Sequence, residues 1–290
     1  MIRRSFLKCA GALVPVMAWP ELTRAAQATP GAEAADGLPE LTITLTDTGF
    51  EVAQPLPAGR YHVIASNSGT ATDSHFGLGK IPDEITDAQY RAFLQSEDGT
   101  DDLAFEDIAF VGAPDWPAPG SSVSGVIDLA PGRYLLFDPI SGREPVTLTV
   151  DGDAPAAAEP AADLTVTLRE MAFDLPETAF RGGAGRWKIT NAGAMSHEMA
   201  ILPVAPEITQ ESFAHLLEVL MSLPEDATPP PDLPEFVYQP VAAIGILAPG
   251  HTSWLDVDLP PGHYLAVCML PFSTGYPHAV DGMYQVFDVT

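Results

Sequence analysis

Apolar and polar residues alternate along several short stretches of this chain. The stretch LTITLT at residues 41–46 is the first, and LTVTL at residues 164–168 follows the same pattern. Alternation with a period of two is typical of a strand that buries one face. Glycine and proline punctuate the chain between these stretches, as they do between short strands. Further strands are predicted over residues 60–65, 122–129, 133–137, 145–150, 263–267 and 284–289.

The strand pattern occurs twice, in residues 41–150 and again in residues 164–290. Residues 151–163 between the two copies are rich in Ala, Pro and acidic residues, which is typical of a linker. A periodic match of this kind predicts two units of similar fold. The copies also match in three other places: 59–69 with 185–193 (with a two-residue offset), Ser74-His75 with Ser196-His197, and 129–135 with 259–265 without a gap.

Each copy contains one stretch with helical character. A helix is predicted over residues 86–95, where Thr86 and Gln89 form a capping box. A second is predicted over residues 209–222. The chain is therefore predicted to be all-β, with two tandem Greek-key β-sandwiches that each carry a helical insertion. Four apolar residues share one face of the second helix: Phe213, Leu216, Leu217 and Leu220.

The N-terminus has the pattern of an export signal. Arg3 and Arg4 precede Phe-Leu-Lys and an apolar run, and small residues follow. This favours a twin-arginine signal over residues 1–28, with an ordinary secretory signal as the alternative. Residues 29–40 are predicted to be a disordered lead. No apolar run is long enough for a membrane span. Because of the export signal, we expect a periplasmic or extracellular protein.

The chain is strongly acidic. It holds 13 basic and 39 acidic residues, a formal net charge of −26. Removing the signal makes the balance more negative, because the signal contains four basic residues and one acidic residue. Such a surface repels nucleic acid and anionic lipid. Solubility alone is the favoured explanation, and the alternative is that the surface attracts a basic redox partner protein or cations. The oligomeric state is not predicted.

The last 25 residues contain three candidate metal ligands, Cys268, His278 and Met283. Removal of the signal leaves Cys268 as the only cysteine, so no disulfide within the chain can form. Thiolate, imidazole and thioether are soft donors that suit copper. The repeat supplies a second imidazole, His197, on a loop expected to meet the Cys268 loop at one end of the sandwich. The predicted site is one copper ion held by His197, Cys268, His278 and Met283.

Each proposed ligand has an alternative interpretation as an ordinary core or surface residue. The other histidines and methionines are predicted to have no role as ligands. Three methionines flank the ligands and are predicted to be core, with passage of Cu(I) as the alternative: Met195, Met199 and Met269. Four histidines are predicted to lie at the surface or in turns: His62, His215, His251 and His263.

These ligands give residues 164–290 a resemblance to the cupredoxins, the blue-copper sandwiches of plastocyanin and azurin. Nine residues separate Cys268 from His278, more than in those two proteins. The loop with Pro277-His278 and Gly282-Met283 is more similar to the type 1 copper loop of copper nitrite reductases. The resemblance implies one type 1 copper in a cupredoxin domain. It extends to the strands of residues 41–150, but not to their ligands.

The chain departs from this family at three positions. Nitrite reductases have a ligand of a second copper just before the cysteine, where this chain has Val267. Many cupredoxins have Asn after the first ligand His, where it steadies the cysteine loop, and this chain has Glu198. The ungapped match places Asp138 opposite Cys268, and no His or Met follows before residue 150. Residues 41–150 are therefore predicted to be a cupredoxin-like domain without copper.

The predicted function is electron transfer through a single type 1 copper in an exported protein. The alternative is a copper carrier or storage protein, or a binding module without redox activity. An enzyme is not expected. The sequence has no His-x-His pair, phosphate loop, Ser-His-Asp order or paired-carboxylate motif.

Overall fold

The computed structural model describes residues 37–72, 74–95, 104–176, 181–223, 230, 233, 236–271 and 275–290. The predicted signal at 1–28 and most of the predicted lead at 29–40 lie outside these residues. Within the described residues, neither α-helix is long and apolar enough to cross a membrane.

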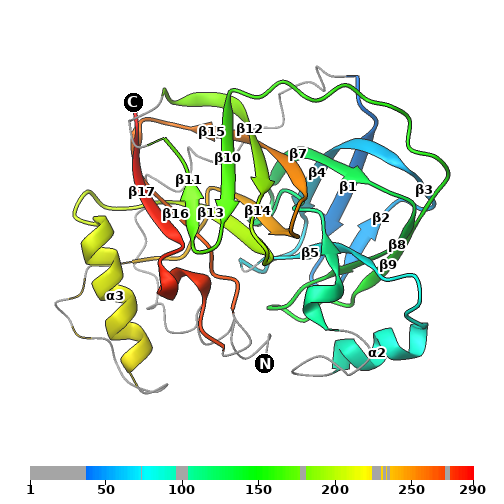
Figure 1. The fold of residues 1–290 in the computed structure, drawn as a ribbon, viewed down its shortest axis with the longest axis horizontal. Helices are drawn as coiled ribbons and strands as arrows, with labels where there is room; N and C mark the ends of the chain where they lie inside the picture. The colour runs from blue at the N-terminus through cyan, green and yellow to red at the C-terminus, as the bar shows by residue number, and fades with distance from the viewer. Residues whose placement is uncertain are drawn as a thin grey trace.

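Three sheets make up the fold, and Figure 1 shows them as two halves side by side. The largest sheet runs in the order β11 (Ala172–Asp174), β10 (Leu164–Arg169), β12 (Gly183–Asn191), β15 (Thr252–Leu259), β7 (Ser122–Leu129), β4 (Gly59–Asn67), β1 (Glu40–Leu45), β2 (Phe50–Val52). A second runs β3 (Leu56–Pro57), β9 (Val146–Asp151), β8 (Gly132–Phe137), β5 (Gly77–Ile81), β6 (Ala109–Phe110). The third runs β14 (Ala242–Leu247), β13 (His197–Pro203), β16 (Gly262–Val267), β17 (Tyr284–Val289).

Each half is a sandwich whose core comes from the alternating apolar positions. Leu41, Ile43 and Leu45 are buried on β1 and pack in one cluster with residues of the five-stranded sheet such as Leu148. In the other half, Val166 on β10 belongs to the same cluster as residues of the four-stranded sheet. In both halves the first strand lies parallel to a later one, β1 to β4 and β10 to β12. The predicted all-β class with two sandwiches is confirmed.

Both helices form where the sequence predicts them. In α2 (Asp87–Gln95), the Thr86 backbone N–H donates to Gln89 Oε1 over 2.9 Å, as a capping box requires. In α3 (Gln210–Ser222), all four predicted apolar residues are buried. Short 3₁₀ turns, η1 (Phe105–Asp107) and η2 (His278–Asp281), complete the elements. Figure 1 shows α2 and α3 far apart, each on its own half.

The largest sheet passes through both halves without a break, a feature that the strand pattern of the sequence does not predict. β7 pairs with β15, with Val126 opposite Trp254 and Gly125 opposite Leu255. A Cβ atom at Gly125 would lie 2.2 Å from the Trp254 carbonyl oxygen, so only glycine permits this approach. No local period marks such a pairing, because it joins strands far apart in the chain. The domain boundaries at 151–163 stay a prediction.

Candidate metal centre

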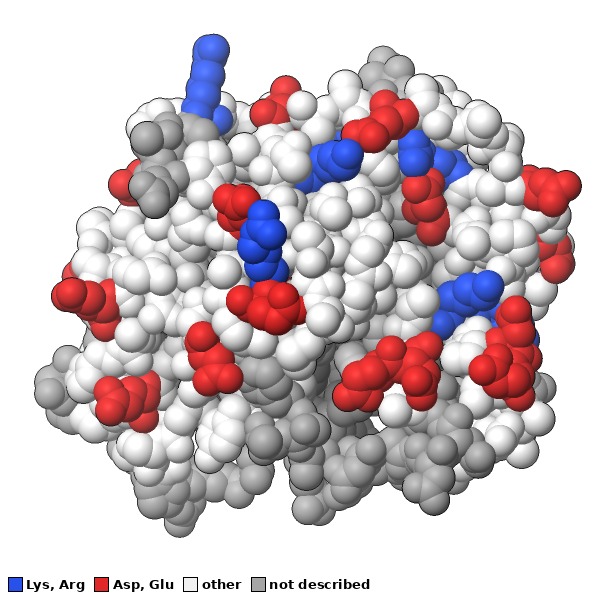
Figure 2. All heavy atoms as spheres, viewed as in Figure 1, with Lys and Arg blue, Asp and Glu red and all other residues white. Residues whose placement is uncertain are grey.

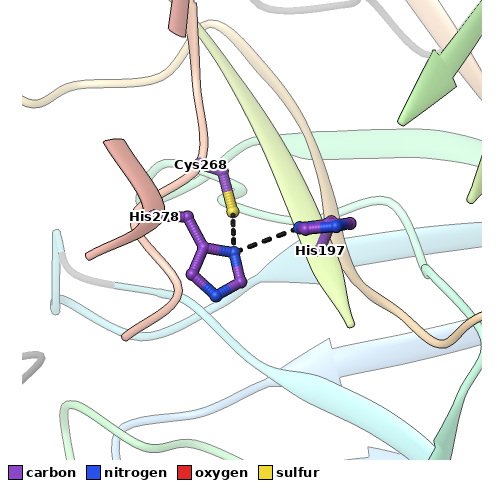
Figure 3. A group of neighbouring side chains, drawn as sticks. All are labelled: His197, Cys268 and His278. Carbon is purple, nitrogen blue, oxygen red and sulfur yellow. Dashed lines mark hydrogen bonds between the residues drawn. The ribbon is translucent and has the colours of Figure 1, made fainter. Parts of the chain in front are cut away.

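Three donor side chains from separate elements meet in the second half (Figure 3). His197 begins β13, Cys268 follows β16, and His278 begins η2. The δ-nitrogen of His278 lies 3.1 Å from that of His197 and 3.5 Å from the Cys268 sulfur. All three donor atoms lie within 4.8 Å of one another, and all three residues are buried. Among the described residues, this is the one group of three or more His, Cys, Asp or Glu donors close enough to hold a metal.

Backbone hydrogen bonds fold the Cys268 loop into this shape. The Cys268 N–H donates to the Met283 carbonyl over 3.0 Å, and the Ala279 N–H donates to the Cys268 carbonyl over 3.0 Å. The Met283 N–H donates to the His278 carbonyl over 3.1 Å. Gly282 has a φ of 105°, which allows the tight turn between η2 and β17. Met283 is fully buried and its backbone lies against Cys268.

The sequence predicts His197 on a loop, but the residue begins strand β13 and is positioned by sheet pairing. It is the first residue of β13, which pairs with β16 so that Ala200 lies opposite Val267. The pairing between β13 and β14 shifts register between His197 and Met199. The chain before it is anchored by Asn191, whose amide donates to the Met195 carbonyl over 2.7 Å. Neighbouring strands therefore bring the segments that carry His197 and Cys268 together.

Burial sets the protonation of the three donors. It lowers the pKa of His197, and burial together with neighbouring His197 lowers the pKa of His278 to about 4. Both imidazoles are therefore neutral near pH 7, which is the protonation state that binds metals. Burial, with the charge of Glu198, raises the pKa of the Cys268 thiol well above its usual value. A metal must then displace the thiol proton to bind the sulfur.

The donor set fits the predicted metal. His197, His278 and Cys268 would supply two imidazole nitrogens and one thiolate sulfur, and Met283 a thioether, which is the donor set of a type 1 copper site. The nitrogens and the sulfur face one another at close range in an otherwise apolar core cluster that includes Met283. The chemistry of the donors is that of copper, as the sequence predicts.

Glu198, the residue after His197, contacts the cysteine loop. Its carboxylate Oε1 accepts the Met269 N–H over 3.0 Å, and its own N–H points at the Cys268 sulfur over 3.5 Å. The side chain is buried. Glu198 thus holds the residue after Cys268, at the position where the resemblance led us to expect Asn.

The first half has an ion pair where the second has Cys268. Asp138 follows β8 as Cys268 follows β16, and it bonds the buried guanidinium of Arg143. The other carboxylate oxygen accepts the N–H groups of Ile140 and Ser141, each over 2.7 Å. These bonds occupy the carboxylate without a metal.

Two predictions about individual side chains need revision. His62, predicted to be at the surface or in a turn, is buried, and its Nε2 lies 3.1 Å from Asp256 Oδ2 of the second half. The sequence gives no sign of a partner so distant in the chain. Met199 and Met269 are buried as predicted, whereas Met195 is 37% exposed.

No family model and no curated protein matches this chain. Among solved structures, auracyanin B is 19% identical over 46% of this chain and 93% of its own, with a TM-score of 0.29. The reduced auracyanin of Roseiflexus castenholzii is 25% identical over 44% and 95%, with a TM-score of 0.29. The copper nitrite reductase of Thermus scotoductus SA-01 is 11% identical over 87% and 61%, with a TM-score of 0.25.

Copper proteins are thus among the solved structures that this chain resembles.

Proposed function

We propose that this protein transfers electrons through a single type 1 copper ion held by His197, Cys268, His278 and Met283. The observation that carries the proposal is the convergence of one buried sulfur and two facing δ-nitrogens within 4.8 Å. Copper in such a site supplies a one-electron couple between Cu(I) and Cu(II).

The protein's part is to keep the donors in one arrangement in both oxidation states. Cys268 and Met283 are tied by a backbone hydrogen bond, and His278 is tied to the same loop by the Met283 N–H. His197 is fixed at the start of β13. Because a close-packed core resists rearrangement, little movement accompanies a change of charge at the metal.

The surface beside the loop suits contact with a partner. Tyr276 is 51% exposed and Val280 39% exposed, and these residues flank His278 in the sequence. The rest of the chain is acidic, and Figure 2 shows acidic side chains over both halves of one face. We therefore expect a basic redox partner that approaches this end of the second half, where electrostatic attraction raises the rate of encounter.

Export is part of the same proposal. The N-terminal Arg3-Arg4 motif and the apolar run after it favour the twin-arginine route. A single buried thiol is protected in an oxidising compartment when it holds a metal. We place the mature protein in the periplasm or outside the cell.

Copper storage or transport is the second candidate. Met195 favours it, because this thioether is 37% exposed two residues before His197 and could receive the soft ion Cu(I). Nitrite reduction is not expected, since buried Val267 stands directly before Cys268. A nitrite turnover assay on copper-loaded protein tests that point, and turnover would contradict it.

Voltammetry of the copper-loaded protein separates electron transfer from storage. We expect a reversible one-electron wave that persists over repeated cycles. Tight binding of Cu(I) with no stable Cu(II) form would contradict electron transfer and support storage. The variant Met195→Leu, which keeps the volume but removes the sulfur, should leave the wave unchanged.

A further inference from the structure

A row of buried polar groups crosses from the copperless half to the cysteine loop. Asp115 bonds Nδ1 of His75. The other ring nitrogen of His75 lies 3.7 Å from Glu198 Oε2, and Glu198 Oε1 accepts the Met269 N–H over 3.0 Å. The three ionisable residues are at most 3% exposed. The row ends one residue from Cys268.

The first half holds His75 firmly in this row. Asp115 Oδ1 accepts the N–H groups of Phe76 over 3.1 Å and of Trp116 over 2.7 Å, so the carboxylate is fixed. The Trp116 ring stacks on the His75 ring, with centroids 5.5 Å apart and planes at 20°. The Asp115 N–H donates to the Ala243 carbonyl of the second half over 3.0 Å. The imidazole therefore faces Glu198 from a rigid support.

The charges of the row are complementary. Burial lowers the pKa of His75, but Asp115 and Glu198 raise it more, to about 9. His75 is then an imidazolium near pH 7. The His75 ring lies across the junction from the buried Glu198 carboxylate, and a buried carboxylate is stabilised by a partner of opposite charge.

We infer that His75 is a positioning residue for the copper site. It holds the Glu198 carboxylate, which holds the Met269 N–H and aims its own N–H at the Cys268 sulfur, so the copperless half helps to set the reduction potential. Hydrogen bonds to a ligating sulfur and charges near a metal both shift its potential. The inference rests on the proposed function and gives the copperless half a role in it.

The test compares two buried histidines of the first half in the copper-loaded full chain. His75→Gln removes the imidazolium that faces Glu198. His62→Gln removes an imidazole that faces Asp256 across the same junction but has no link to the cysteine loop. We expect a lower reduction potential and a shifted visible band in His75→Gln, because Cu(II) is favoured when a nearby positive charge is lost. His62→Gln should keep both values. An unchanged or raised potential in His75→Gln, or an equal fall in His62→Gln, would overturn the inference.

A second comparison isolates the link through Glu198. His75→Gln is introduced again in a Glu198→Gln background, where the neutral amide needs no counter-charge. We expect a smaller change in potential there than in the wild-type background. Folding of His75→Gln only in that background would also support the inference. Equal effects in both backgrounds, or failure to fold in both, would show that His75 acts independently of Glu198 and would overturn it.

The two proposals fail in different ways. A wild-type protein without a thiolate-to-copper band contradicts the proposed function itself. A normal band in every variant, together with a potential that does not respond to His75, leaves electron transfer standing and overturns only the role of His75.

Discussion

The δ-nitrogens of His197 and His278 lie 3.1 Å apart, although 81 positions separate the two residues in the chain. Their ring planes cross at 71°, so the two rings meet edge to face and are not stacked. Burial lowers both pKa values, which leaves two neutral imidazoles side by side next to a buried thiol. A metal ion bound between them would satisfy all three groups at once.

Removing one imidazole should weaken copper binding strongly. For His278→Gly we expect a loss of more than roughly 100-fold in copper affinity. Mutation of a residue that only hydrogen-bonds to a metal ligand already lowers metal affinity by about 10- to 100-fold. Competition with a chelator of known affinity measures the change. Added imidazole should restore the visible band, because it can enter the space that the side chain leaves.

The exposed His215 on α3 is the matched control for this change. His215→Gly should bind copper as tightly as the wild type, although it weakens the helix. Equal losses of affinity in the two variants would contradict the assignment of His278 as a ligand.

Asp256 should stabilise the junction between the halves in a pH-dependent way. Despite burial, hydrogen bonds from His62 and Arg186 lower the pKa of Asp256 from 3.8 to about 2. A lowered pKa in the folded state means that the stabilisation is complete above pH 3.8 and is lost as the pH falls through about 2. The shift corresponds to roughly 2 kcal/mol.

Urea unfolding of Asp256→Asn against wild type tests this expectation. The variant should lose about 2 kcal/mol at pH 7, and the difference should shrink as the pH falls from about 4 to 2. Asp258→Asn, two residues along β15, is the control and should change little. A loss that is the same at pH 2 and pH 7 would argue against the ionised Asp256.

Gly125 should be required for the continuous sheet. A methyl group there would meet the Trp254 carbonyl oxygen at 2.2 Å, so β7 and β15 would have to separate. Gly125→Ala should cost about 1–3 kcal/mol of unfolding free energy, the usual range for overpacking. At Gly59, on β4 of the same sheet, a Cβ would make an ordinary contact of 3.6 Å with Pro155. Thermal unfolding of both variants measures these costs. Gly59→Ala should lose less unfolding free energy than Gly125→Ala, and the reverse order would contradict the close approach of β7 to β15.

The local features of the fold can be predicted from the sequence, but the junction between the two halves cannot. The alternation at residues 41–46 and the face formed by Phe213, Leu216, Leu217 and Leu220 give β1 and α3 almost residue by residue, because period and burial are local properties. The order Cys268, His278, Met283 can also be seen in the sequence. Gly282 predicts a tight turn before Met283, and its φ of 105° in the structure makes that turn.

What joins the two halves leaves no local pattern. The pairing of β7 with β15, the contact of His62 with Asp256 and the contact of His75 with Glu198 each join residues more than a hundred positions apart. Glu198 is noticeable in the sequence only as a departure from the Asn expected there. Its contact with His75 follows from how the two sandwiches meet, which neither half specifies alone.

Titration of the metal-free protein with Cu(II), followed in the visible spectrum, tests the central claim most directly. We predict one copper bound per chain and an intense thiolate-to-copper charge-transfer band in the wild type. Cys268→Ser, which differs only in the sulfur atom, should lack the band. A wild type without the band, or a Cys268→Ser variant that keeps it, would contradict a type 1 copper site at Cys268.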